Sequence, residues 1–120
     1  MKILVVEDGI EVRQSLQRNL EHNGYQVLTA SDGMQAIERT QKEEPDLILL
    51  DIMLPLLDGY RVLKLLKSDE RYQKIPILVV TARGDAEDWA LALECGANGC
   101  LIKPVRSEDL LEKIEHWLHA

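Results

Sequence analysis

The sequence predicts one α/β domain built on a parallel β-sheet, and two patterns support this prediction. The first is a set of short, continuous apolar runs rich in branched residues, which is typical of strands covered on both faces. The second is the regular alternation of these runs with segments of helical periodicity, joined by short connections. Such alternation favours a parallel sheet with right-handed crossovers. The chain has 120 residues, enough for one domain with its own core.

Five segments are expected to form strands. Four are continuous apolar runs, and the remaining one, Gln26–Ala30, is weaker because it mixes polar with apolar residues. The four strong runs are Ile3–Val6, Leu47–Leu50, Ile75–Val80 and Cys100–Ile102. All have the length of ordinary strands, so each is expected to cross the sheet once.

Five helices are expected to follow the strands, one after each. The first should stop at Asn23-Gly24, the second before Pro45 and the fourth at Gly96, while Ser107 is the expected N-cap of the fifth. The apolar positions that mark the five helices are, in order, Val12, Leu16 and Leu20; Ala36 and Ile37; Val62, Leu63 and Leu66; Ala90, Leu91 and Leu93; and Leu110, Ile114 and Leu118.

Composition excludes several classes of protein. Acidic residues outnumber basic ones 21 to 14, a formal net charge of −7, which argues against DNA or RNA as a direct partner. No apolar run approaches the ~20 residues needed to span a bilayer, and the N-terminus lacks the features of a signal peptide. The two cysteines, Cys95 and Cys100, are too few for a disulfide framework, so we expect a reduced, cytoplasmic protein.

Ionisable or hydroxyl side chains follow four of the five expected strands. Glu7-Asp8 follows the first strand, Asp51 the third, Thr81 the fourth and Lys103-Pro104 the fifth. In an open α/β sheet, ligands bind at the carboxyl ends of the strands, so these side chains are expected at one edge. The second strand leads into Ser31-Asp32-Gly33, a pattern typical of a turn and a helix cap.

Three acids at one edge repel each other, so either one stays protonated or a cation lies among them. A site with oxygen ligands and neither His nor Cys suits a hard ion such as Mg²⁺. Asp can act as a nucleophile and form an aspartyl-phosphate. Lys103 and Thr81 could then stabilise the charge on the phosphoryl oxygens.

In their order and on these strand ends, the motifs resemble the receiver domain of bacterial response regulators, the phosphorelay component of two-component signal transduction. The resemblance covers essentially the whole chain, so residues 1–120 are expected to form one receiver, or phosphoacceptor, domain. The motifs that carry it are Glu7-Asp8, Asp51-Ile52-Met53-Leu54-Pro55, Asp58-Gly59, Thr81-Ala82-Arg83-Gly84-Asp85, Gly96-Ala97 and Lys103-Pro104.

The resemblance implies a flavodoxin-like sheet of order 2-1-3-4-5 and a phosphoryl group accepted by Asp51. It implies that Asp8, Asp51 and the main-chain carbonyl of Met53 bind Mg²⁺, with Glu7 acting mostly through a metal-bound water. It also implies that Thr81 and Lys103 hold the phosphoryl oxygens, and that the Lys103-Pro104 bond is often cis. Such a domain catalyses only its own phosphorylation and dephosphorylation, so it is not expected to be an enzyme on other substrates.

The chain departs from the family pattern at the positions that couple the phosphorylation site to the output face. The switch position three residues before Lys103 holds Cys100 in place of Tyr or Phe, and Val105 stands where Phe is common. The usual pair of acids before that position is replaced by Asn98-Gly99, and Trp89 lies near the start of the fourth helix. We therefore expect Thr81 to carry most of the coupling, and we expect Trp89, Cys100 and Val105 to form an apolar output face.

The expected partners are a sensor histidine kinase or phosphotransfer protein and an output domain or protein. A homodimer through the fourth helix, fifth strand and fifth helix is a further possibility, and no membrane contact is expected. The main alternative is a pseudo-receiver that binds partners without phosphorylation. An FMN-binding flavodoxin and an Asp-x-Asp phosphatase fit less well, because Glu7-Asp8-Gly9 repels phosphate and Asp51-Ile52-Met53 lacks the second Asp.

Overall fold

The computed structural model describes residues 1–82 and 86–119. Arg83-Gly84-Asp85, part of the motif that begins at Thr81, therefore lies outside the described residues. Strands and helices alternate as expected, and every predicted element is present. In chain order they are β1 (Lys2–Val6), α1 (Ile10–His22), β2 (Gln26–Ala30), α2 (Gly33–Glu43), β3 (Leu47–Asp51), α3 (Gly59–Lys67), β4 (Ile77–Thr81), α4 (Ala86–Glu94), β5 (Gly99–Ile102) and α5 (Ser107–Leu118).

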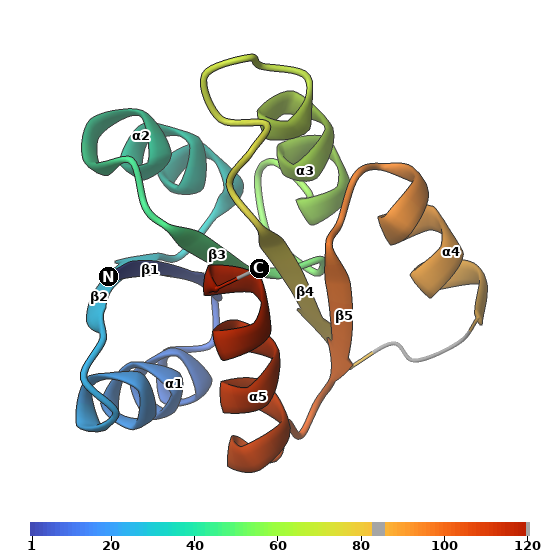
Figure 1. Cartoon of the computed structure of the whole chain (residues 1–120). Helices are drawn as coiled ribbons and strands as arrows, with labels where there is room; N and C mark the ends of the chain where they lie inside the picture. The colour runs from blue at the N-terminus through green and yellow to red at the C-terminus, as the bar shows by residue number, and fades with distance from the viewer. Residues whose placement is uncertain (83–85, 120) are drawn as a thin grey trace.

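The five strands form one parallel sheet in the order β2-β1-β3-β4-β5, which confirms the flavodoxin-like arrangement. Helices α1 and α5 lie on one side of the sheet, and α2, α3 and α4 lie on the other (Figure 1). Each side has its own cluster of buried apolar residues, with the strand residues alternating between the two. This burial on both faces explains the continuous apolar runs in the sequence.

The N-cap of the fifth helix and the start of the fourth strand differ from the sequence prediction, while β1, β3, β4 and β5 each extend one residue beyond one predicted end. Helix α5 begins at Ser107 itself, and its N-cap is Arg106, which makes no side-chain capping bond. The Ser107 hydroxyl instead lies 3.2 Å from the side-chain oxygen of Asn19 on α1. Strand β4 begins at Ile77 rather than Ile75: its pairing with β3 starts at Ile77, and Pro76 before it has no amide to donate to a strand ladder.

The predicted cap of α2 is confirmed, and α3 is capped in the same way. Asp32 accepts from the amide of Gln35 at 2.8 Å, and Asp58 accepts from the amide of Arg61 at 3.1 Å. Gly59, just after the second cap, packs against the end of β3: a Cβ here would lie 2.7 Å from the carbonyl oxygen of Asp51. A side chain at position 59 would therefore push α3 away from the strand that carries Asp51.

None of the helices in the described ranges combines the length and the apolar character that a membrane crossing requires.

Candidate functional site

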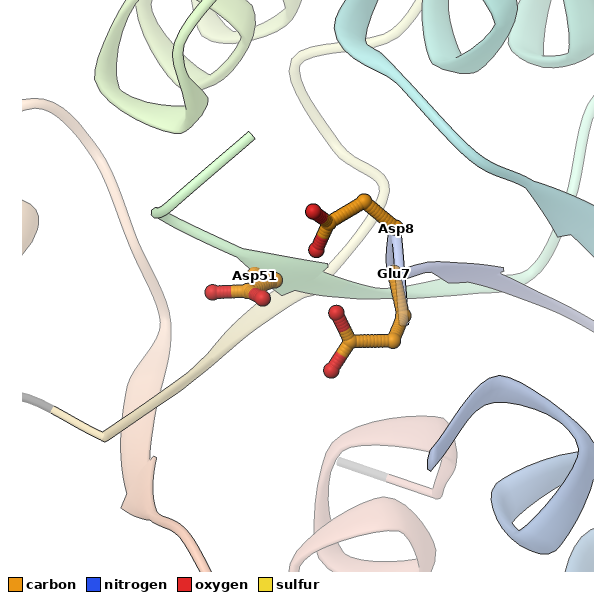
Figure 2. Close-up of side chains that lie close together, drawn as sticks. All are labelled: Glu7, Asp8 and Asp51. Atoms are coloured by element: carbon orange, nitrogen blue, oxygen red, sulfur yellow. The ribbon is translucent and has the colours of Figure 1, made fainter. Parts of the chain in front are cut away.

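The parallel sheet delivers the predicted site residues to one edge. Glu7 and Asp8 follow β1, Asp51 is the last residue of the neighbouring strand β3, and Thr81 is the last residue of β4. Lys103 follows β5, and its amide donates to the carbonyl of Thr81 at 2.8 Å, which holds these two strand ends side by side. The side chains of Glu7, Asp8 and Asp51 gather at the ends of β1 and β3 (Figure 2).

The three carboxylates form a tight cluster. One oxygen from each lies within 4.8 Å of the others. Glu7 and Asp51 are buried, at 2% and 4% exposure, whereas Asp8 is exposed. At such separations the three negative charges repel one another, most strongly where burial lowers the effective dielectric. The cluster therefore requires positive charge nearby.

Lys103 supplies one positive charge. Its ammonium group forms an ion pair with Oε1 of Glu7 and lies 3.0 Å from Oδ2 of Asp51. Burial alone would lower the pKa of Lys103, but the hydrogen bonds and charges of Glu7 and Asp51 outweigh burial and raise the pKa. Lys103 is thus held protonated between the two buried acids, and Asp8 forms no ion pair within the described ranges.

The second oxygen of Asp51 is also oriented. Oδ1 accepts from the amide of Met53 at 3.0 Å, which closes the turn after β3.

Thr81, the remaining predicted catalytic residue, is fully buried at the end of the adjacent strand. The Lys103-Pro104 bond is cis, in agreement with the expectation from the resemblance.

The residues present fit a divalent cation. The ligand atoms are all oxygens, they converge within 4.8 Å, and they carry more negative charge than Lys103 neutralises. Hard, oxygen-rich sites of this kind select Mg²⁺ or Ca²⁺ over softer transition metals. Glu7 and Asp8 do not act as caps of α1, because the N-cap of that helix is Gly9 and no side-chain capping bond is formed there.

The predicted output face is brought together, but it is less exposed than expected. Trp89, Cys100 and Val105 line one hollow of about 390 Å³ between α4, β5 and α5. Cys100 is only 8% exposed, and Trp89 and Val105 are partly buried against the two core clusters. The expected exposure is therefore wrong for Cys100, whereas the role of the three residues as an output face stays a prediction. Among the large hydrophobic residues that line this hollow, Ile102 is the exposed one, at 44% exposure.

Cys100 and Cys95 are both free and buried. Burial raises the pKa of the Cys100 thiol, and the charge of Lys113 only partly offsets this. A raised thiol pKa disfavours the reactive thiolate.

Two sets of contacts were not predictable from motifs. Arg13 on α1 donates to the main-chain carbonyls of Glu7 and Asp8. Tyr60 on α3 donates from its hydroxyl to the carboxylate of Asp88 on α4, at 3.2 Å. Both depend on how the helices pack, and spacing alone carried no signal for either.

A family model described as "Response regulator receiver domain" matches residues 3–115, nearly the whole chain. The chain belongs to the response regulator receiver family. The response regulator MprA of Mycobacterium leprae is 43% identical over 118 residues, which is 98% of this chain and 51% of that protein. The alkaline phosphatase synthesis transcriptional regulatory protein PhoP of Bacillus subtilis is 45% identical over 116 residues, or 95% of this chain and 47% of that protein. The receiver thus spans about half the length of these two relatives.

Solved structures agree with this assignment. The receiver domain of a sensor histidine kinase from Pseudomonas aeruginosa has a TM-score of 0.92 at 31% identity, covering 99% of this chain and 98% of that one. Its magnesium ion is coordinated in the active site cleft. The chemotaxis protein CheY4 of Vibrio cholerae has a TM-score of 0.90 at 34% identity, covering 96% of each chain.

Proposed function

We propose that this receiver accepts a phosphoryl group on Asp51 from a phosphohistidine of a sensor kinase or phosphotransfer protein, in a Mg²⁺-dependent reaction. The observation that carries the proposal is the cluster of Glu7, Asp8 and Asp51, with Lys103 bridging the two buried acids. A structural role alone does not account for three acids and a lysine drawn from three strand ends.

In this proposal a carboxylate oxygen of Asp51 attacks phosphorus. The new P–O bond forms as the P–N bond breaks, and the electron pair of the broken bond returns to the imidazole nitrogen of the donor. Lys103 then moves its hydrogen bond from the carboxylate to a phosphoryl oxygen, and the Thr81 hydroxyl donates to another. The amide of Met53 keeps the carboxyl group of Asp51 in orientation.

Asp8, Asp51 and the main-chain carbonyl of Met53 would hold the Mg²⁺ ion, with Glu7 acting through a bound water. The ion would supply positive charge for the phosphoryl oxygens, which the acid cluster by itself repels. The reaction is self-catalysed, so the receiver would be a signalling phosphoacceptor and not an enzyme acting on other substrates. Nothing in the described residues favours the pseudo-receiver alternative, since every phosphorylation residue of the family pattern is present.

Mass spectrometry of the intact protein tests the proposal. Incubation with Mg²⁺ and a small phosphodonor should add the mass of one phosphoryl group, and the adduct should be labile to base. Asp51→Asn should abolish the adduct, whereas Asp109→Asn, a matched change at an exposed position on α5, should keep it. If neither a small donor nor a cognate kinase produces an adduct, the phosphoacceptor function is refuted.

We also propose that phosphorylation shifts a pre-existing equilibrium of α4, with Thr81 as the coupling residue. The face formed by α4, β5 and α5 would then bind a protein partner, an output domain or a second copy of the chain. This binding would take place in the cytoplasm and without direct nucleic-acid contact. The hollow beside Trp89 and Cys100 supports this choice of face. Solution scattering with and without a phosphoryl mimic tests for a second copy, since a monomer under both conditions would exclude the homodimer.

A further inference from the structure

Arg13 contacts the backbone of the acid cluster, and within the described residues its side chain forms no hydrogen bond to the carboxylates. Nη1 of Arg13 donates to the carbonyl oxygen of Glu7 at 2.9 Å and lies 3.4 Å from that of Asp8. The guanidinium is partly buried, and it has no carboxylate partner among the described residues. Arg13 is therefore placed to act on the peptide groups that carry the acids.

The two carbonyls lie in a stretch without regular hydrogen bonding. Strand β1 ends at Val6, and the first main-chain bond of α1 runs from the amide of Arg13 to the carbonyl of Gly9. The carbonyls of Glu7 and Asp8 fall between these two ladders, and no main-chain donor is found for either in the described ranges. Without the guanidinium, the Glu7–Asp8 peptide plane would lose its hydrogen bond, and the Asp8–Gly9 plane would be held only through the bond from the Gly9 amide to Oε2 of Glu7.

Rotation of these planes would redirect the two acidic side chains. Glu7 is otherwise tied at its carboxylate, where Oε2 accepts from the amide of Gly9 at 3.3 Å and Oε1 pairs with Lys103. Asp8 has neither kind of contact, since its side chain is exposed and forms no ion pair in the described part of the chain. The orientation of Asp8 therefore depends mainly on its backbone.

We propose that Arg13 is a positioning residue for the metal site, holding the Glu7–Gly9 turn so that the Asp8 carboxylate faces a divalent cation beside Asp51. This inference rests on the proposed Mg²⁺-dependent function and adds to it a residue outside the ligand set. Lys103 occupies carboxylate oxygens that a cation also needs, whereas Arg13 leaves all of them free. Outer-shell partners of this kind commonly change metal affinity by about 10- to 100-fold.

The charge and the positioning role of Arg13 predict opposite effects. Removing a positive charge near the cluster would by itself strengthen Mg²⁺ binding, because the acids would attract the cation more strongly. Releasing the turn would weaken binding, because Asp8 would have to be ordered when the ion binds. The direction of the change in affinity therefore distinguishes the two roles.

The experiment is a calorimetric titration of the full chain with MgCl₂, without phosphodonor. Arg13→Ala should raise the dissociation constant roughly tenfold. Arg13→Lys keeps the charge and one donor, so its affinity should fall between those of Arg13→Ala and the wild type. Arg18→Ala removes an exposed arginine of the same helix that forms no side-chain hydrogen bond or ion pair within the described ranges, and it should leave the affinity unchanged. Amide shifts of Glu7 and Asp8 show whether the turn has moved.

Equal or tighter Mg²⁺ binding by Arg13→Ala would overturn the positioning role and leave the proposed function standing. Absence of Mg²⁺ binding by the wild type would overturn the metal site and this inference together. If Arg13→Ala fails to fold, the Arg13→Lys and Arg13→Gln pair decides: a loss of affinity in Gln that is larger than in Lys supports the role, and no difference refutes it.

Discussion

Asp8 is the acid whose removal should make the metal-free receiver more stable. One of its oxygens lies within 4.8 Å of oxygens on Glu7 and Asp51, and Lys103 pairs with those two acids instead. At 4.8 Å, the upper limit of the separation between these oxygens, two like charges repel by about 0.9 kcal/mol in a medium like water, the appropriate limit for an exposed side chain. With two such neighbours, Asp8→Asn should raise the free energy of unfolding by about 1–2 kcal/mol.

Thermal unfolding in EDTA at low salt measures this effect. For a chain of 120 residues, one kcal/mol moves the midpoint by roughly 4 °C, so a rise of about 4–8 °C is expected. The difference should shrink as salt screens the charges. Mg²⁺ should reverse the order of stability, because an ion that binds only the folded state stabilises the wild type more than a variant that lacks a ligand.

Glu115→Gln is the matched control, since it removes one negative charge from an exposed position on α5 without a side-chain contact. Any general benefit of reducing the net charge of −7 will appear in both variants. If Asp8→Asn is no more stable in EDTA than Glu115→Gln, the carboxylates do not repel each other in the folded chain. The electrostatic reasoning behind the cation site would then fail.

Three further predictions concern residues around the site. Lys103→Met leaves two buried acids without their cation, so in EDTA at pH 7 it should lower the free energy of unfolding by about 3 kcal/mol. The folded state raises the pKa of Lys103 above its ordinary 10.5, so the wild type should lose this advantage as the pH rises through the raised value. Urea titrations at several pH values measure both effects. Tyr60→Phe removes the hydrogen bond to Asp88 and should cost about 1 kcal/mol, with faster amide exchange in α4; unchanged exchange would show that the contact does not hold the helix. Leu56→Asn should raise the free energy of unfolding, measured in urea, by about 1 kcal/mol, because Leu56 is 83% exposed and has a φ of 66°, which Asn tolerates better. A lower free energy of unfolding in this variant would show that the leucine side chain contributes packing.

The fold was largely predictable because its signals are local. Strand β3 is buried along its whole length and reads as a continuous apolar run, and α1 shows its apolar stripe at spacings of four. The capping positions Asp32 and Asp58 also act within three residues of the amides that they bind. Ser107 was the exception, because an N-cap depends on the angle at which the chain enters the helix, which no short pattern records.

The candidate site was predictable as a set of residues but not as a set of contacts. Parallel strands end at one edge, so Asp8, Asp51, Thr81 and Lys103 had to be neighbours once the sheet was known. The order of the strands and the family resemblance carried that step. The burial of Cys100 was not predictable, because exposure at β5 depends on how α4 and α5 pack over it.

The sequence by itself determined the alternation of strands and helices, the acids at the strand ends and the excess of negative charge that favours a bound cation. Only the tertiary structure decided how that charge is distributed. Lys103 and Glu7 are 96 residues apart in the chain yet form an ion pair, and Arg13 reaches back to the carbonyls of the turn before its own helix. Which side chains contact each other depends on packing in three dimensions, whereas hydrophobic periodicity is a local property of the sequence.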